Sequence, residues 1–115
     1  MIFAAIFAIV VGVGMIGQWI LFLATDQVPE LRTEPLRIRF HLAAEFVTAT
    51  ALLVAGAALL TDQTWGRWLY LLATGMLLYT VIVSPGYFAE KGQWAFVAMF
   101  AVLLVLALVS LALVI

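Results

Sequence analysis

The sequence predicts an all-α fold: an integral membrane four-helix transmembrane bundle that runs up-down-up-down. The first observation is composition, since 68% of the 115 residues are hydrophobic and 10% are charged, whereas soluble domains average about 45–50% and about 25%. The second is length, because four apolar stretches near the roughly 20 residues that cross a bilayer, joined by short polar turns, account for the chain. Short turns make consecutive helices antiparallel neighbours, so we expect a single transmembrane domain over residues 1–115.

The first predicted span covers residues 2–24. It lacks the positively charged start of a signal peptide, and its apolar run exceeds the roughly 7–15 residues typical of one, so we expect it to be retained. Gly12, Gly14 and Gly17 lie in its second half, where glycines would let a neighbouring backbone approach closely.

The second predicted span, residues 36–60, follows a charged loop. Thr33-Glu34-Pro35 is typical of a helix start, with Thr33 as the N-cap and Pro35 where its missing N–H costs nothing. The third predicted span, residues 65–84, should end or kink at Ser84-Pro85-Gly86, because proline disrupts the interior of a helix.

The fourth predicted span, residues 94–115, has Ser110 as its single polar side chain, so we expect it to face lipid or another subunit. Aromatic residues support the span boundaries, because Trp and Tyr gather at membrane–water interfaces. Those near the span ends are Trp19, Trp65, Trp68, Tyr87 and Trp94.

Positive charges predict the orientation. The loops over residues 26–39 and 85–93 share one side and hold Arg32, Arg37, Arg39 and Lys91, whereas the other side holds only Arg67. Because cytoplasmic loops carry the excess of Lys and Arg, we expect both loops in the cytoplasm and both termini outside, in a multi-pass protein of the cell (inner) membrane. Insertion in both orientations is the alternative.

Composition also excludes several classes of function. The chain has no cysteine, which excludes disulfides, cysteine-ligated zinc and iron–sulfur clusters. Its net charge of −1 gives no field that would attract nucleic acid, so we expect no nucleic-acid partner. His41 is the only histidine; with Glu45 it offers two metal ligands, which rarely suffice, and we expect no metal.

The candidate site lies at the start of the second span. His41 and Glu45 are four residues apart and share a helix face, Thr48 continues that face, and Arg39 precedes it. An ionisable residue this deep in a span rarely faces lipid and marks a functional site with a partner. Glu45 would bind a proton, a cation or a ligand hydroxyl, with His41 as relay or second ligand contact. The alternative is that Glu45 pairs with His41, Arg39 or a tyrosine and locks helix packing.

Two residues of other spans complete the predicted site. Gln18 in the first span and Tyr79 in the third would reach the same cavity as Glu45 and form a ligand pocket. The alternative for the hydroxyl groups of the third span is helix packing, since such groups bond back to their own helix or across to a neighbour.

One stretch resembles a known family. His41-Leu-Ala-Ala-Glu45-Phe46, followed by the small and aliphatic run over residues 49–60, is similar to the second span of the DoxX-like small four-helix membrane proteins, and Ala73-Thr-Gly-Met76-Leu-Leu-Tyr79 is similar to their third span. The chain departs from the pattern by having Ala44 rather than Gly before the glutamate. The resemblance implies the four-helix fold, an association with quinone-linked redox systems, and a role for Glu45.

Three functions are consistent with these features. The first is a non-enzymatic membrane module, an oligomeric or accessory subunit of a larger complex, that holds a lipid or quinone near Glu45 and needs no other cofactor. The second is a small proton-coupled transporter or ion pathway that uses Glu45. The third is a membrane enzyme with His41 and Glu45 as acid and base, which the absence of a catalytic motif places last.

Overall fold

The computed structural model describes residues 1–115 and is entirely helical, which confirms the all-α prediction. Four helices are long, and a single-turn helix lies between the first two. The long helices are α1 (Ile2–Ala24), α3 (Pro35–Leu60), α4 (Gly66–Glu90) and α5 (Trp94–Val114), and the short one is α2 (Glu30–Thr33). All four long helices are long and apolar enough to cross a membrane, which is consistent with a multi-pass membrane protein.

The boundaries of α1, α3 and α5 match the predicted spans to within one residue. Helix α4 differs, because it continues through Pro85 to Glu90 instead of ending at Ser84. Packing holds these last turns in place despite the hydrogen bond that proline removes: the ring of Phe88 stacks on Phe96 and Phe100 of α5, with centroids 4.6 and 5.8 Å apart.

The start of α3 also differs in one detail. Pro35 occupies the first turn as predicted, but Glu34 rather than Thr33 is the N-cap residue, and it makes no side-chain capping bond. The Thr33 hydroxyl instead donates back to the carbonyl of Pro29, 3.5 Å away. Thr33 therefore closes the single turn of α2 and does not open α3.

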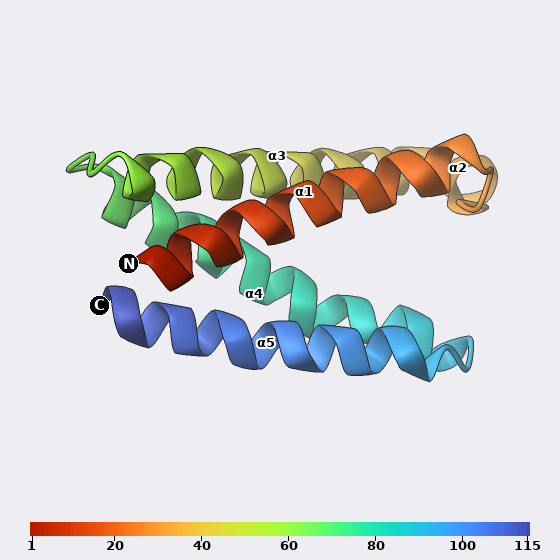
Figure 1. Cartoon of the computed structure of the whole chain (residues 1–115). Helices are drawn as coiled ribbons and strands as arrows, with labels where there is room; N and C mark the ends of the chain where they lie inside the picture. The colour runs from red at the N-terminus through yellow and green to blue at the C-terminus, as the bar shows by residue number, and fades with distance from the viewer.

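Each long helix packs on the next long helix in the chain, and α1 also touches α5. Figure 1 shows both chain termini and the α3–α4 turn at one end of the bundle, which we call the termini end. The opposite end, which we call the α2 end, holds α2 and the turn between α4 and α5 (Figure 1). In the same view α1 and α5 lie close together at the termini end and apart at the α2 end.

Glycines bring α1 and α3 into close contact. A Cβ added at Gly56 would lie 2.7 Å from Cγ1 of Ile9 and 2.9 Å from the carbonyl oxygen of Ala5. A Cβ at Gly12 would lie 3.0 Å from the carbonyl oxygen of Ala49. The prediction of close approach is confirmed for Gly12. It is wrong for Gly14 and Gly17, where a Cβ would meet nothing within 4 Å.

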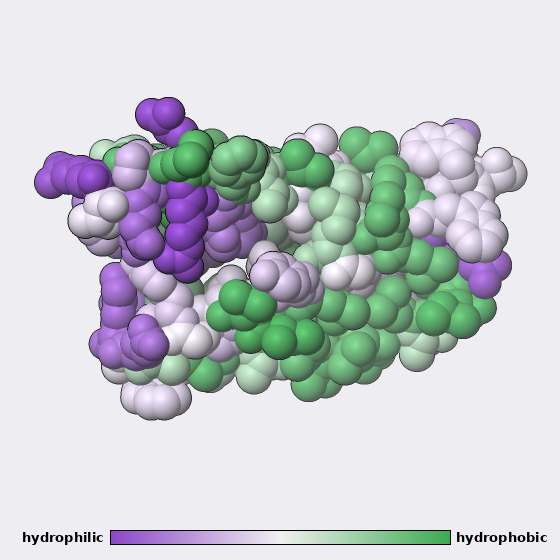
Figure 2. All heavy atoms as spheres, turned by 180° about the vertical axis from the view of Figure 1, so that it is seen from behind, coloured by the Kyte–Doolittle hydropathy of each residue, from purple (hydrophilic) through white to green (hydrophobic).

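The core is densest at the termini end. The buried residues of α1 all lie between Ala4 and Gly12, and no residue of this helix after Gly12 is buried. The hydroxyl of Tyr70 in α4 donates to Oγ of Ser110 in α5, and both side chains are fully buried. Figure 2 shows hydrophilic residues gathered mainly at the α2 end and hydrophobic side chains over most of the length between the two ends.

Candidate functional site

Glu45 lies on the buried face of α3, about 15 Å along the helix from its start at a rise of about 1.5 Å per residue. The side chain is only 5% exposed. Its neighbours on that face are Ile38, Thr48, Ala49 and Leu52, all of them buried. The pattern of apolar positions in α3 therefore turns the Glu45 side chain into the bundle.

Both contacts of the Glu45 carboxylate use the same oxygen. Oγ1 of Thr80 in α4 donates to Oε1 at 2.8 Å, and Nε2 of His41 lies 3.4 Å from the same atom. Oε2 has no hydrogen-bond partner, and it is not sealed from contact, since Oγ1 of Thr74 is the one fully enclosed side-chain polar atom without a partner. One oxygen of Glu45 is thus held by the protein, and the other is free to accept a hydrogen bond.

His41 connects Glu45 to the surface and to α1. Its side chain is 44% exposed, and its ring meets the ring of Trp19 edge to face, with centroids 5.7 Å apart. Because Trp19 lies in the second half of α1, this pair joins α1 to α3 near the α2 end. The imidazole is oriented by Trp19 on one side and by the Glu45 carboxylate on the other.

The structure places the other predicted site residues in different surroundings. Thr48 is buried, but its hydroxyl donates to the carbonyl of Ala44 at 2.7 Å and so serves its own helix. Arg39 is exposed, and Gln18 is half-buried in α1; neither makes a hydrogen bond to Glu45. Tyr79 is 72% exposed and makes no hydrogen bond to Glu45, which Thr80 bonds instead.

Two residues outside the predicted set reach the site. Thr80 follows Tyr79 by one position, and the 100° step of a helix turns it toward Glu45. Trp19 follows Gln18 by one position and contacts His41. The sequence does single out Thr80, because it and Ser84 are hydroxyl residues one turn apart in a predicted span. For Trp19 the sequence indicates only an aromatic residue near the end of a predicted span. Ser84 is half-buried and donates no hydrogen bond within the chain.

A second group of polar side chains closes the α2 end. Nζ of Lys91 donates to the hydroxyl of Tyr87 at 2.6 Å and lies 4.2 Å from the centre of its ring. The Tyr87 side chain also lies close enough to Glu30 to influence the pKa of its carboxyl group. Val28, in the same linker as Glu30, is 4% exposed. We call Glu30, Tyr87 and Lys91 the strap, because they fasten α2 to the end of α4.

Contacts within the strap shift the pKa values of Glu30 and Lys91. Partial burial alone would raise the pKa of Glu30, but the hydrogen bond from Tyr87 and the charges of Lys91 and Arg37 outweigh it and lower that pKa. The hydrogen bond to Tyr87 raises the pKa of Lys91 despite its slight desolvation, and the nearby Glu30 charge adds to the effect. The charged forms of both groups are therefore favoured in the folded chain.

Comparison with known proteins identifies one family for the whole chain. A family model described as "Domain of unknown function (DUF8058)" matches residues 1–115. The chain belongs to the DUF8058 family. No curated protein and no solved structure matches it.

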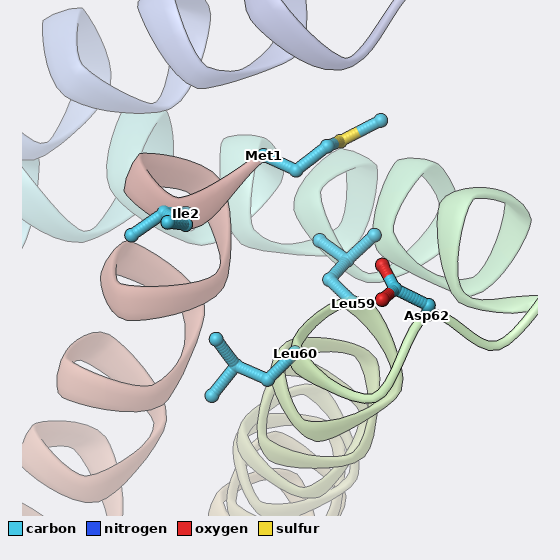
Figure 3. A pocket seen from close by; sticks show the side chains of 5 residues that line it. All are labelled: Met1, Ile2, Leu59, Leu60 and Asp62. Atoms are coloured by element: carbon cyan, nitrogen blue, oxygen red, sulfur yellow. The ribbon is translucent and has the colours of Figure 1, made fainter.

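The DUF8058 chain also has a pocket at the termini end, far from Glu45. Its volume is about 290 Å³, and the five lining residues are Met1, Ile2, Leu59, Leu60 and Asp62. Figure 3 shows these side chains around the start of α1 and the end of α3, with the carboxylate of Asp62 beside Leu59. None of the predicted site residues lines this pocket. In addition, no group of three or more His, Asp or Glu side chains in the DUF8058 chain could hold a metal ion.

Proposed function

We propose that this DUF8058 chain is a non-enzymatic multi-pass protein of the cell's inner membrane that holds the polar group of a lipid- or quinone-type molecule at Glu45. Its four long helices would cross the bilayer up-down-up-down, with both termini outside and the α2 end in the cytoplasm. The chain would act as an oligomer or as an accessory subunit of a larger membrane complex.

The proposal rests on a difference between the two carboxyl oxygens of Glu45: Oε1 has partners in the chain and Oε2 has none. Burying a carboxylate costs several kcal/mol, and partners repay this only when they satisfy its hydrogen-bonding capacity. Thr80 and His41 both contact Oε1, so Oε2 lacks the partner that a purely structural carboxylate would have. A ligand that donates to Oε2 would supply it.

The surrounding groups indicate the chemistry of that ligand. A hydroxyl, phenol or amine could donate to Oε2 of Glu45, while the half-buried amide of Gln18 could donate to or accept from a second polar atom. The rest of the bundle interior is mostly apolar, with Thr48, Thr74 and Ser110 as the other buried polar residues, which suits a lipophilic body. The resemblance of the second span to DoxX-like proteins favours a quinone or its hydroquinone within this class.

Native mass spectrometry of the gently detergent-purified protein tests the proposal. Wild type should carry a co-purified small molecule that Glu45→Gln loses, because the neutral amide is a weaker acceptor for the ligand's donor. Glu90→Gln is the matched control: it removes an exposed carboxylate at the end of α4 and should keep the molecule. Bare wild-type protein, or equal occupancy in Glu45→Gln, would refute the ligand site.

A second candidate function is a proton-coupled transporter or ion pathway. The observation that favours it is the link from buried Glu45 through half-exposed His41 to the α2 end. In vesicles with a trapped pH-sensitive dye, Glu45→Gln would then abolish proton movement, and the Glu90→Gln control would not. Flux equal in wild type and Glu45→Gln would eliminate this candidate.

A further inference from the structure

We call the line along which two neighbouring long helices face each other a seam. Three of the four seams have a hydrogen bond or an aromatic contact toward the α2 end. Trp19 contacts His41 across α1 and α3. Thr80 bonds Glu45 across α3 and α4. Phe88 stacks on Phe96 and Phe100 across α4 and α5. No hydrogen bond, ion pair or aromatic contact joins α1 to α5, and Figure 1 shows these two helices apart at this end.

Burial along the inner face of α1 agrees with an open seam. Ala4 and Ala8 are fully buried and Val11 is 8% exposed, yet Met15 and Gln18, which continue the same face by steps of four and three residues, are only half-buried. On α5 the change is similar, since Ala107, Ser110 and Val114 are buried at the termini end and Phe100 alone is buried in the first half. The α1–α5 seam therefore widens toward the α2 end.

The linker that contains α2 covers the α2 end of the bundle in the direction of the helix axes. The strap of Glu30, Tyr87 and Lys91 ties the linker that contains α2 to the end of α4, and Val28 of this linker is buried. A molecule that reaches Glu45 along the bundle axis would have to displace this linker. A molecule dissolved in the bilayer would instead meet the α1–α5 seam from the side.

We propose that the ligand of Glu45 enters sideways from the bilayer, between α1 and α5, and that it is an amphiphile with a hydrogen-bond donor on its head and a long apolar tail. The head donates to Oε2 of Glu45, the oxygen that has no partner in the chain. The tail lies in the seam against Met15 and the half-buried apolar residues of α5 between Phe96 and Leu104. This inference rests on the proposed function and adds to it the route and the need for a tail.

Photo-crosslinking with two probes tests the route. One probe is an alkylphenol with a diazirine in its long chain; the other is a water-soluble phenol that carries the diazirine and no chain. The full-length protein is reconstituted in phosphatidylcholine vesicles, and labelled peptides are mapped by mass spectrometry. The long probe should label the first half of α5 and the second half of α1 in wild type, and the short probe should label neither above background.

Two variants identify the seam as the path. Met15→Trp puts a bulky ring into the seam and should lower labelling by the long probe about tenfold, as should Glu45→Gln through loss of the charged acceptor. Val13→Trp is the matched control, because Val13 is 59% exposed on the outer face of α1 and its replacement should leave labelling unchanged.

The outcomes separate the route from the site. Equal, Glu45-dependent labelling by both probes would overturn the sideways route and keep the ligand site, as would labelling that falls in Glu45→Gln but not in a folded Met15→Trp. Labelling that is indifferent to Glu45→Gln would overturn the proposed function together with the route. The comparison of the two probes in wild type decides the route without any variant.

Discussion

The hydroxyl of Thr80 donates to Oε1 of Glu45 at 2.8 Å, and this is the only side-chain hydrogen bond that joins α3 to α4. The Glu45 side chain is 5% exposed, so the bond forms where water competes little with it. The pair therefore holds two helices together and also leaves Oε2 as the free face of the site.

Replacing Thr80 with valine should destabilise the bundle by about 1–2 kcal/mol, because a buried hydrogen bond between two helices is lost while the shape is kept. Thermal unfolding in detergent, followed by circular dichroism, measures the change. Thr80→Ser keeps the donor and should stay near wild type, and so should Thr50→Val, since Thr50 is exposed. A Thr80→Val protein as stable as wild type would mean that the bond contributes nothing to the fold.

Gly56→Ala should destabilise the protein by about 1–3 kcal/mol, the usual range for overpacking. The new Cβ would lie 2.9 Å from the carbonyl oxygen of Ala5, a backbone atom that can move only with α1. Gly75→Ala is the control within the same bundle, because nothing lies within 4 Å of its Cβ; there alanine should stabilise by up to about 1 kcal/mol through helix propensity. The same unfolding assay compares them, and equal effects would contradict the packing described for α1 and α3.

Tyr70→Phe should cost about 0.6–1.7 kcal/mol, the range for interhelical hydrogen bonds in membrane proteins, because it removes the buried bond to Ser110. Tyr79→Phe should cost almost nothing, since Tyr79 is 72% exposed and its hydroxyl bonds no residue of the chain. Retention of the ligand by Tyr79→Phe in native mass spectra would further place Tyr79 outside the site. Loss of ligand in that variant would restore the expectation from the sequence.

The contribution of the strap to the stability of the folded chain should depend on pH. Folding lowers the pKa of Glu30 below its ordinary value of 4.5, so its contribution is present above pH 4.5 and is lost as the pH falls through the folded-state pKa. Folding raises the pKa of Lys91 above 10.5, so that contribution is complete below pH 10.5 and is lost as the pH rises through the folded-state pKa.

Hydrogen exchange can follow the acid side of this dependence. The backbone N–H groups of Thr33 and Glu34 bond the carbonyls of Pro29 and Glu30, and their protection, corrected for the intrinsic rate, should fall as Glu30 is protonated. Glu30→Gln should show the low protection at every pH, whereas Glu90→Gln should behave as wild type. Protection that ignores pH in wild type would show that the strap does not order α2.

The four long helices were predictable from the sequence, because apolar runs of about 20 residues bounded by polar turns are typical of helices long enough to cross a bilayer. The course of α4 was harder to predict. Pro85 is an ordinary signal for a helix end, and only the stacking of Phe88 on α5 shows why the helix continues. This contact joins two different helices, and the sequence around Pro85 does not reveal it.

The candidate site was predictable in part. Glu45 could be found because a charged residue in an apolar span needs a partner, and His41 could be placed from the four-residue spacing within one helix. The partner on α4 could not, because rotation of one helix about its axis relative to another is set by packing. A choice between Tyr79 and Thr80 required that rotation.

The contact between α1 and α5 closes the four long helices into a ring at the termini end only. At the α2 end, α1 is connected to α4 only indirectly, through the contact of Trp19 with His41 and the bond of Thr80 to Glu45 on α3. The bundle is therefore a closed ring of helices at one end and an open row of helices at the other.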